Sequence, residues 1–129
     1  MNAARYKHSY LHSIANAWLV ANVPTHQWLI DFDLQIWQGE NYFVLRPDIA
    51  GKNKADGTID ICIEISDSTL SQDLNGKRAL YASAGMQTYM VIDCQNNRLL
   101  LWTLQGSQLR AEHDLGKFAG LAQAIATAN

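Results

Sequence analysis

Residues 59–66 read Ile-Asp-Ile-Cys-Ile-Glu-Ile-Ser, and this stretch decides the fold. Strict alternation over eight residues predicts a β-strand, because successive side chains of a strand point to opposite faces. One face would carry Asp60, Cys62 and Glu64, and the other would carry the isoleucines at 61, 63 and 65. We expect the isoleucines to be more buried than Asp60 and at least as buried as Glu64, in a central strand packed under a helix.

The rest of the chain supplies helices and strands on both sides of this stretch. Apolar residues at helical spacing predict helices over residues 6–22, 70–84 and 118–128. Alternating or apolar runs between turn residues predict strands over residues 26–38, 42–50, 59–66, 88–93, 98–104 and 108–113, with a polar loop over 51–58. This order predicts an α/β fold in which helices pack on one mixed sheet.

Composition limits the kind of protein that this chain can be. Its 129 residues fit a single domain, and 48% hydrophobic residues suffice for a core that we expect to include the four tryptophans. The net charge of −2 excludes a strongly basic nucleic-acid binder, so any DNA binding has to come from a local patch. A polar N-terminus, no long apolar run and two isolated cysteines predict a cytoplasmic protein with free thiols and no membrane span.

Two carboxylates stand out as a candidate metal site. In the expected strand 42–50, Val44, Arg46 and Asp48 share one face. If this strand pairs with the strand 59–66, Asp48 and Glu64 converge near the strand ends. Two carboxylates with neighbouring backbone carbonyls form an oxygen-rich site, which suits Mg²⁺ or Mn²⁺.

A lysine on the next helix is the third candidate. Five residues follow one another at helical spacing and share one helix face: Leu70, Leu74, Lys77, Tyr81 and Ala84. An ammonium on the core side of a helix is costly unless it is paired, and Glu64 lies just upstream. We therefore expect the Lys77 ammonium within ion-pair range of Glu64 or of a metal-bound water. Taken alone, such a lysine more often reaches water, and a strand carboxylate more often lies on a solvated face. Three charged residues facing inward on consecutive elements favour a functional site.

These residues carry a family resemblance. The run from Arg46-Pro47-Asp48 through residues 60–69 and 73–85 resembles the Uma-type restriction endonucleases of the PD-(D/E)XK nuclease superfamily. The resemblance implies a restriction-endonuclease-like mixed sheet flanked by helices, in a single PD-(D/E)XK nuclease-like domain over residues 1–129. It also implies Asp48, Glu64 and the backbone carbonyl of Ile65 as metal ligands. In the standard motif a lysine stands two residues after the acid, where this chain has Ser66; similar members supply it from the next helix, which matches Lys77.

The first functional hypothesis is therefore a Mg²⁺- or Mn²⁺-dependent endonuclease that hydrolyses DNA phosphodiester bonds. Asp48, Glu64 and Lys77 would be its catalytic residues, and the candidate phosphate contacts are Arg46, Lys52, Lys54 and Arg78. The alternative is a catalytically inactive nuclease-fold module for binding or assembly, which the mildly acidic composition favours. The sequence leaves open whether the domain acts alone or as a homodimer.

The first helix departs from what related nucleases can have. They can place an additional acid there, whereas no glutamate precedes Glu40 in this chain. His8 and His12 lie on that helix instead, four residues apart and so on one face. Such a pair can bind a metal or contact a phosphate, but it more often belongs to an exposed helix face, which is what we expect here.

Overall fold

The computed structural model describes the backbone of residues 3–67 and 70–128, and the side chains of residues 6–67 and 75–128. Within these ranges the helices are α1 (Ala3–Asn22), α2 (Leu70–Ser83) and α3 (Ala119–Ala126), with a short 3₁₀ helix η1 (Gly116–Phe118) before α3. The strands are β1 (His26–Ile30), β2 (Leu34–Gln38), β3 (Asn41–Leu45), β4 (Ile49–Asn53), β5 (Ile59–Ser66), β6 (Thr88–Asp93), β7 (Arg98–Gln105) and β8 (Gln108–Glu112).

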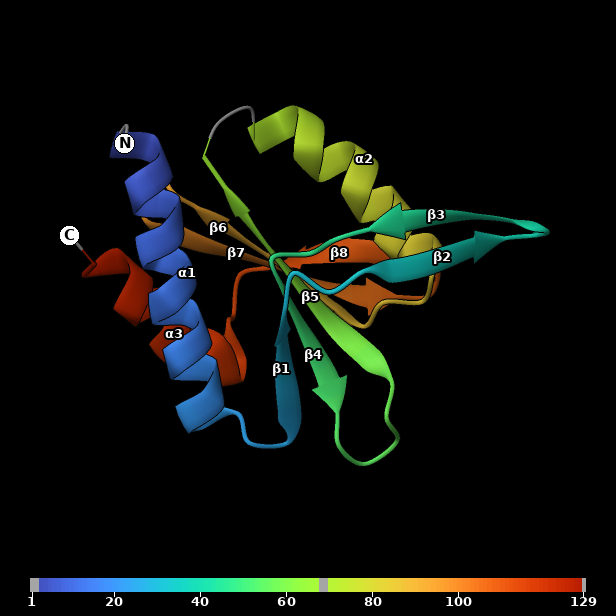
Figure 1. The fold of residues 1–129 in the computed structure, drawn as a ribbon, viewed down its shortest axis with the longest axis horizontal. Helices are drawn as coiled ribbons and strands as arrows, with labels where there is room; N and C mark the ends of the chain where they lie inside the picture. The colour runs from blue at the N-terminus through green and yellow to red at the C-terminus, as the bar shows by residue number, and fades with distance from the viewer. Residues whose placement is uncertain (1–2, 68–69, 129) are drawn as a thin grey trace.

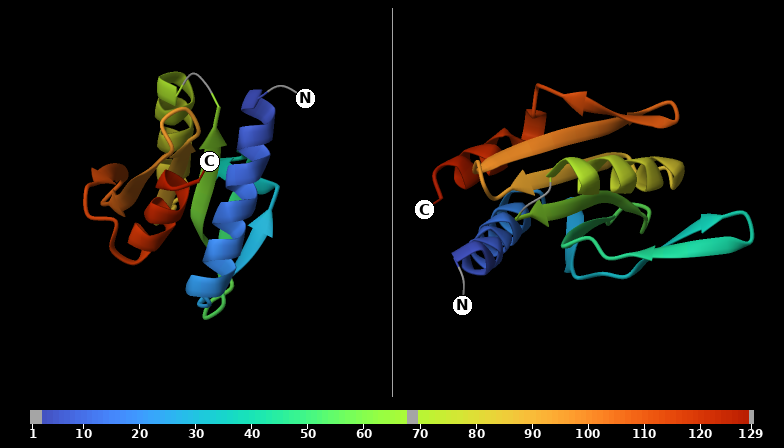
Figure 2. Two further views of the ribbon diagram at one scale, coloured as in Figure 1. Left: turned by 90° about the vertical axis from the view of Figure 1, so that its left-hand side faces the viewer. Right: turned by 90° about the horizontal axis from the view of Figure 1, so that it is seen from above.

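Six of these strands form one mixed sheet in the order β1-β4-β5-β6-β7-β8. β5 and β6 are parallel, and the other neighbours in the sheet are antiparallel. Helices α1 and α3 lie side by side on one face, and α2 lies on the other (Figures 1 and 2). The domain is thus a mixed α/β fold with helices on both faces of the sheet, as the order of elements predicts.

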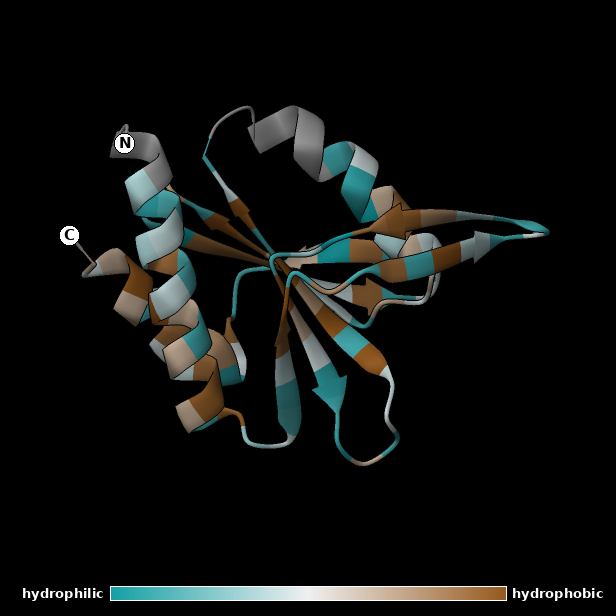
Figure 3. Cartoon of the chain, viewed as in Figure 1, coloured by the Kyte–Doolittle hydropathy of each residue, from teal (hydrophilic) through white to brown (hydrophobic). Residues whose placement is uncertain are grey.

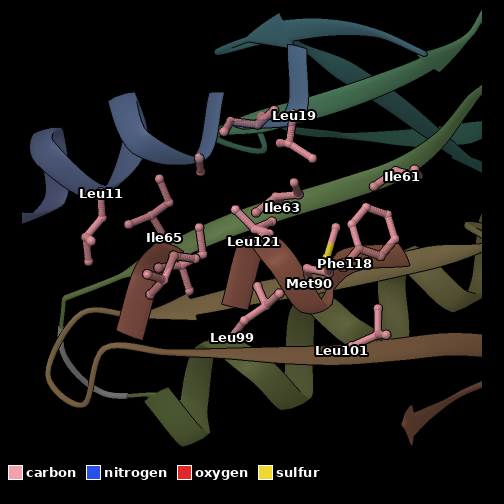
Figure 4. Close-up of a cluster of buried hydrophobic side chains, with 14 of the residues drawn as sticks. Leu11, Leu19, Ile61, Ile63, Ile65, Met90, Leu99, Leu101, Phe118 and Leu121 are labelled. Atoms are coloured by element: carbon pink, nitrogen blue, oxygen red, sulfur yellow. The ribbon is translucent and has the colours of Figure 1, made fainter. Parts of the chain in front are cut away.

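β5 is the central strand that its alternation predicts, since it pairs with β4 on one side and β6 on the other. Ile61, Ile63 and Ile65 are 3%, 0% and 6% exposed, whereas the side chains of Asp60 and Glu64 are 21% and 12% exposed. The isoleucines contact the apolar sides of α1 and α3, from which Leu11, Leu19 and Leu121 point toward β5 (Figure 4). The burial prediction is confirmed.

The opposite face of the sheet holds a second apolar cluster. Cys62 of β5 lies in it with Tyr81 of α2, Tyr89 of β6 and Trp102 of β7, and the β2–β3 hairpin contributes Ile36. Figure 3 shows hydrophobic residues along the strands and a polar turn at the tip of this hairpin. Glu64 faces the same side as Cys62, so α2 and the hairpin flank the side of β5 that carries the carboxylate.

One part of the predicted sheet is wrong. The runs 26–38 and 42–50 were expected to be two long strands, but each is interrupted, and β2 and β3 form a separate two-stranded sheet. Asp31 adopts a left-handed conformation (φ 52°), which ends β1, and Pro47 lies where the returning chain bends. The register is nevertheless kept across the bend, because Ile30 faces Ile49 and, four residues further along each strand, Leu34 faces Leu45.

The structure corrects three smaller expectations as well. Val44, Arg46 and Asp48 do not share the face of one strand, since Val44 belongs to β3 whereas Arg46 and Asp48 lie between β3 and β4. Trp37 is 58% exposed on the hairpin rather than in the core, because the hairpin projects away from the main sheet (Figure 1). Ala84 is exposed, since α2 ends at Ser83 and Gly85 follows with φ 76°.

The side chains of Leu70 and Leu74, two members of the predicted α2 stripe, lie outside the described residues, whereas Tyr81 is fully buried. Cys62 and Cys94 are free, and both are buried. Among the described helices, none has the length and apolar character to cross a membrane.

Candidate functional site

Asp48 lies at the bend that precedes β4 and faces the end of β5. β4 begins at Ile49, opposite Ile63, so β4 has no residue opposite Ile65. The Asp48 side chain takes this place, and its Oδ2 accepts the backbone N–H of Ile65 at 2.7 Å. A strand residue directs its N–H and its C=O to the same side, so the Ile65 carbonyl also points toward the Asp48 side of β5.

Glu64 is held from the α2 side by two donors. Tyr81 donates its hydroxyl to Oε1 at 3.0 Å, and the Lys77 ammonium lies 3.5 Å from Oε2. Tyr81 is fully buried, whereas the Lys77 side chain is 39% exposed and can still reach solvent or a ligand. The geometric prediction that Lys77 lies within ion-pair range of Glu64 is confirmed.

The charge of Glu64 is only partly compensated by these neighbours. Burial raises the pKa of its carboxyl, and the negative charge of Asp48 adds to the increase. The Lys77 charge and the Tyr81 hydrogen bond act in the opposite direction without cancelling the increase. Burial and the Glu64 charge also raise the pKa of Tyr81, so Tyr81 remains a donor. A further cation beside Glu64 would therefore stabilise its ionised form.

The donor set fits a small divalent ion that keeps part of its water shell. Within residues 6–67 and 75–128 no three or more His, Cys, Asp or Glu side chains are grouped so that they could hold an ion by themselves. Mg²⁺ does not need such a group, because it is bound through one or two carboxylates, with water and substrate phosphate completing its coordination. Two carboxylates beside the strand-end carbonyl of Ile65 meet this requirement.

The four candidate phosphate contacts are not gathered around Asp48 and Glu64. Arg46 lies two residues before Asp48, but its Nε donates to Asp33 at 2.7 Å. The Arg78 guanidinium lies over the Trp102 ring, 5.4 Å from its centroid. Lys52 lies near the far end of β4 and Lys54 follows that strand, so both are separated from Asp48 by the length of β4.

Asp60, which shares the face of Glu64, belongs to a different cluster four residues earlier in β5. It accepts a hydrogen bond from Asn53 at 3.0 Å and contacts His26 Nε2 at 2.8 Å. Thr25 lies 2.9 Å from the other nitrogen of His26. These contacts tie the start of β5 to the last residue of β4 and the first residue of β1, so Asp60 is not a neighbour of the Asp48–Glu64 site.

Sequence reasoning assigned His8 and His12 to an exposed helix face, and this is wrong. His12 Nε2 lies 3.1 Å from the Asp48 backbone oxygen, and His8 Nε2 lies 3.7 Å from Asp48 Oδ1. The spacing of four residues indicates that the two rings share a face, but it does not tell which partner that face meets. The missing information is the packing of α1 through Leu11, which is fully buried against the sheet.

Comparison with known proteins agrees with this architecture. Residues 7–125 match the model of the Uma2 family, which is described as a putative restriction endonuclease, whereas no curated protein sequence matches the chain. A putative nuclease from Anabaena variabilis superimposes with a TM-score of 0.57 at 16% identity, over 98% of this chain and 81% of that one. The type IIG restriction endonuclease BpuSI superimposes with a TM-score of 0.58 at 11% identity, over 92% of this chain but only 16% of its own length.

Identities this low show that the fold is shared, but they say nothing about activity. The family match, in contrast, spans almost the whole chain. The chain belongs to the Uma2 family of putative restriction endonucleases and has their restriction-endonuclease-like α/β fold.

Proposed function

We propose that this protein is a metal-dependent nuclease that hydrolyses DNA phosphodiester bonds as an endonuclease, with Mg²⁺ or Mn²⁺ as its cofactor. The observation that carries the proposal is the convergence of Asp48, Glu64 and Lys77 at the end of β5, in a chain of this family. A buried carboxylate with a raised pKa and a lysine partner, such as Glu64, is characteristic of functional sites.

The metal ligands in this proposal are Asp48, Glu64 and the carbonyl of Ile65. The Ile65 N–H fixes Asp48 through Oδ2, which leaves Oδ1 for the ion. Tyr81 fixes Glu64 through Oε1. When bound, a divalent ion polarises the phosphate and lowers the pKa of a coordinated water.

Lys77 acts beside the reacting phosphate in this proposal. Glu64 positions its ammonium, and the Lys77 side chain remains 39% exposed, so a phosphate entering from solvent can approach it. There it offsets the negative charge that develops on the phosphate in the transition state and helps to orient the attacking water. Arg46, Lys52, Lys54 and Arg78 stay predicted contacts to more distant phosphates, for which extended DNA would have to run along β4 and α2.

Cleavage of plasmid and branched DNA with Mg²⁺ or Mn²⁺ tests the proposal, with Glu64→Ala as the inactive variant. We expect nicking or linearisation by the wild-type chain that EDTA abolishes and that Glu64→Ala lacks. Equal cleavage by Glu64→Ala would point to a contaminating nuclease and would contradict the assignment of Glu64.

One observation favours a second candidate, a nuclease-fold module that binds or assembles without cleaving. Both Glu64 oxygens already have a partner, Tyr81 at Oε1 and Lys77 at Oε2, so the carboxylate has neighbours even without an ion. A chain that binds DNA but cleaves neither plasmid nor branched substrate with either ion would support this module over the enzyme.

A further inference from the structure

Helix α1 directs two imidazoles at different atoms of Asp48. The rings of His8 and His12 are 6.3 Å apart, and each presents Nε2 to the aspartate. His12 Nε2 lies 3.1 Å from the backbone oxygen, which can only accept, so this nitrogen must carry a proton and donate. His12 thereby fixes α1 to the bend, and the carboxylate is left to His8.

The contact between His8 and Asp48 is too long for a hydrogen bond. Asp48 Oδ2 is occupied by the Ile65 N–H, and His8 Nε2 faces the other oxygen, Oδ1, at 3.7 Å. Hydrogen bonds between nitrogen and oxygen have lengths of about 2.7–3.2 Å. Two donor atoms that are each about 2.1 Å from one ion are about 3.0 Å apart at a right angle and about 3.4 Å apart at the tetrahedral angle. A small closure of the pair would therefore give the spacing of two ligands of one ion.

Both side chains are accessible to an ion from solution. The His8 side chain is 28% exposed and that of Asp48 is 22% exposed. Because His8 lies on the first turns of α1, the position is set by a helix that packs through Leu11 on the sheet. The pair is thus held by the fold and still open on one side.

We propose that His8 Nε2 becomes a ligand of the ion that Asp48 binds when the two side chains close on it, since as they stand the described side chains form no group of three His, Cys, Asp or Glu ligands. This inference rests on the metal site of the proposed function and extends it. The resulting set has one imidazole nitrogen beside carboxylate and carbonyl oxygens. Imidazole binds transition metals better than it binds Mg²⁺, and affinity for such sites rises from Mn²⁺ to Co²⁺. His8 therefore makes this site select Mn²⁺ or Co²⁺ over Mg²⁺.

The competing explanation is an ordinary ion pair between a protonated His8 and the Asp48 carboxylate. At the observed exposure such a pair contributes little to stability and leaves metal binding to oxygen ligands alone. The two explanations differ in whether nitrogen is bound to the ion, which a spectroscopic measurement reads without any assay of cleavage.

The test combines calorimetric titration with Mn²⁺, Co²⁺ and Mg²⁺ and pulsed electron paramagnetic resonance of the bound Mn²⁺, on the full chain and on His8→Gln. We expect imidazole-nitrogen modulation in the wild-type spectrum that His8→Gln abolishes, and a tenfold or larger loss of Mn²⁺ and Co²⁺ affinity in that variant. Mg²⁺ affinity should change less than threefold. His113→Gln, at an exposed histidine after β8, is the matched control and should keep the signal.

The outcomes separate this inference from the proposed function. Mn²⁺ binding that Asp48→Ala abolishes, but with no nitrogen modulation or with modulation that persists in His8→Gln, overturns the role of His8 and leaves the carboxylate site intact. A wild-type chain that binds no ion through Asp48 overturns both. Circular dichroism melts of every variant establish that lost binding is not lost folding.

Discussion

Lys77→Met removes one ammonium from the site and little else. The methionine keeps most of the apolar stem, and Tyr81 still anchors α2 in the second cluster, so the domain should stay folded. Lys77 Nζ lies 3.5 Å from Glu64 Oε2. Two unit charges at this distance attract each other by roughly 5 kcal/mol at an effective dielectric constant of 20. Since the Lys77 side chain is 39% exposed, solvent screening reduces the interaction, and we retain about half of it.

The same screened energy estimates how much Lys77 stabilises a phosphate that gains negative charge at a similar distance in the transition state. Half of roughly 5 kcal/mol is about 2.5 kcal/mol, and the loss of this much transition-state stabilisation lowers a rate by about 70-fold. Removal of one electrostatic donor from an enzyme site has effects of this size. We therefore expect Lys77→Met to cut DNA at about one hundredth of the wild-type rate or less.

The assay is the first-order rate of plasmid nicking at saturating Mn²⁺, with the melting temperature as the check on folding. Lys117→Met is the control, because it removes a lysine that lies over the Phe118 ring on η1, which packs on the face of the sheet opposite to α2 and Glu64. A Lys77→Met rate within threefold of the wild type would refute the electrostatic role. An equal loss in Lys117→Met would show that overall charge, not position, sets the rate.

Three further predictions concern binding and stability. Titration with Mn²⁺ should show one site in the wild-type chain and none in Asp48→Ala, and undiminished binding by that variant would remove Asp48 from the site. Burial alone would raise the pKa of Asp93, but hydrogen bonds from the turn after it and from Arg98 outweigh burial and lower it. The Asp93 carboxylate thus stabilises the fold above about pH 4, and this stabilisation is lost as the pH falls through the lowered pKa. Asp93→Asn should lower the free energy of unfolding in urea by about 2 kcal/mol at pH 7. The difference from the wild type should shrink toward pH 3. Gly51→Ala should lower the free energy of unfolding by about 1–3 kcal/mol, because a Cβ there would lie 2.8 Å from the Trp28 ring, and an unchanged urea midpoint would contradict that packing.

The parts of the site on β5 and α2 could be predicted because local periodicity determines them. The alternation in residues 59–66 fixes which face carries Glu64, and it fixes this independently of the partner strands. Helical spacing then places Lys77 on the side of α2 that faces the sheet. Neither inference depends on how the more distant parts of the chain pack.

The bend before Asp48 could not be predicted in the same way. Both runs around it are apolar and suit strands, and the register of Ile30 with Ile49 and Leu34 with Leu45 continues across the interruption. What divides the ribbon is a left-handed Asp31 and the turn at Pro47. Aspartate tolerates that conformation but does not require it, so the residue type alone gives no signal.

The approach of His8 and His12 to Asp48 depends on tertiary packing. An i, i+4 pair of histidines looks the same on an exposed helix as on one that covers a site. The deciding contact joins residues 36 positions apart, from His12 to Asp48, and no local pattern encodes it. The exposure of Trp37 could not be predicted for the same reason, because it depends on the direction in which the β2–β3 hairpin projects from the main sheet.

The dependence of DNA cleavage on Mn²⁺ concentration tests the central claim most directly, namely that the ion held by Asp48 and Glu64 serves cleavage. The account predicts that the concentration giving half-maximal cleavage equals the dissociation constant from calorimetry, and that Glu64→Gln, which keeps the shape of the side chain, weakens binding and lowers the rate at least a hundredfold. Cleavage that proceeds in EDTA, or that Glu64→Gln carries out with the wild-type rate and Mn²⁺ dependence, would contradict it.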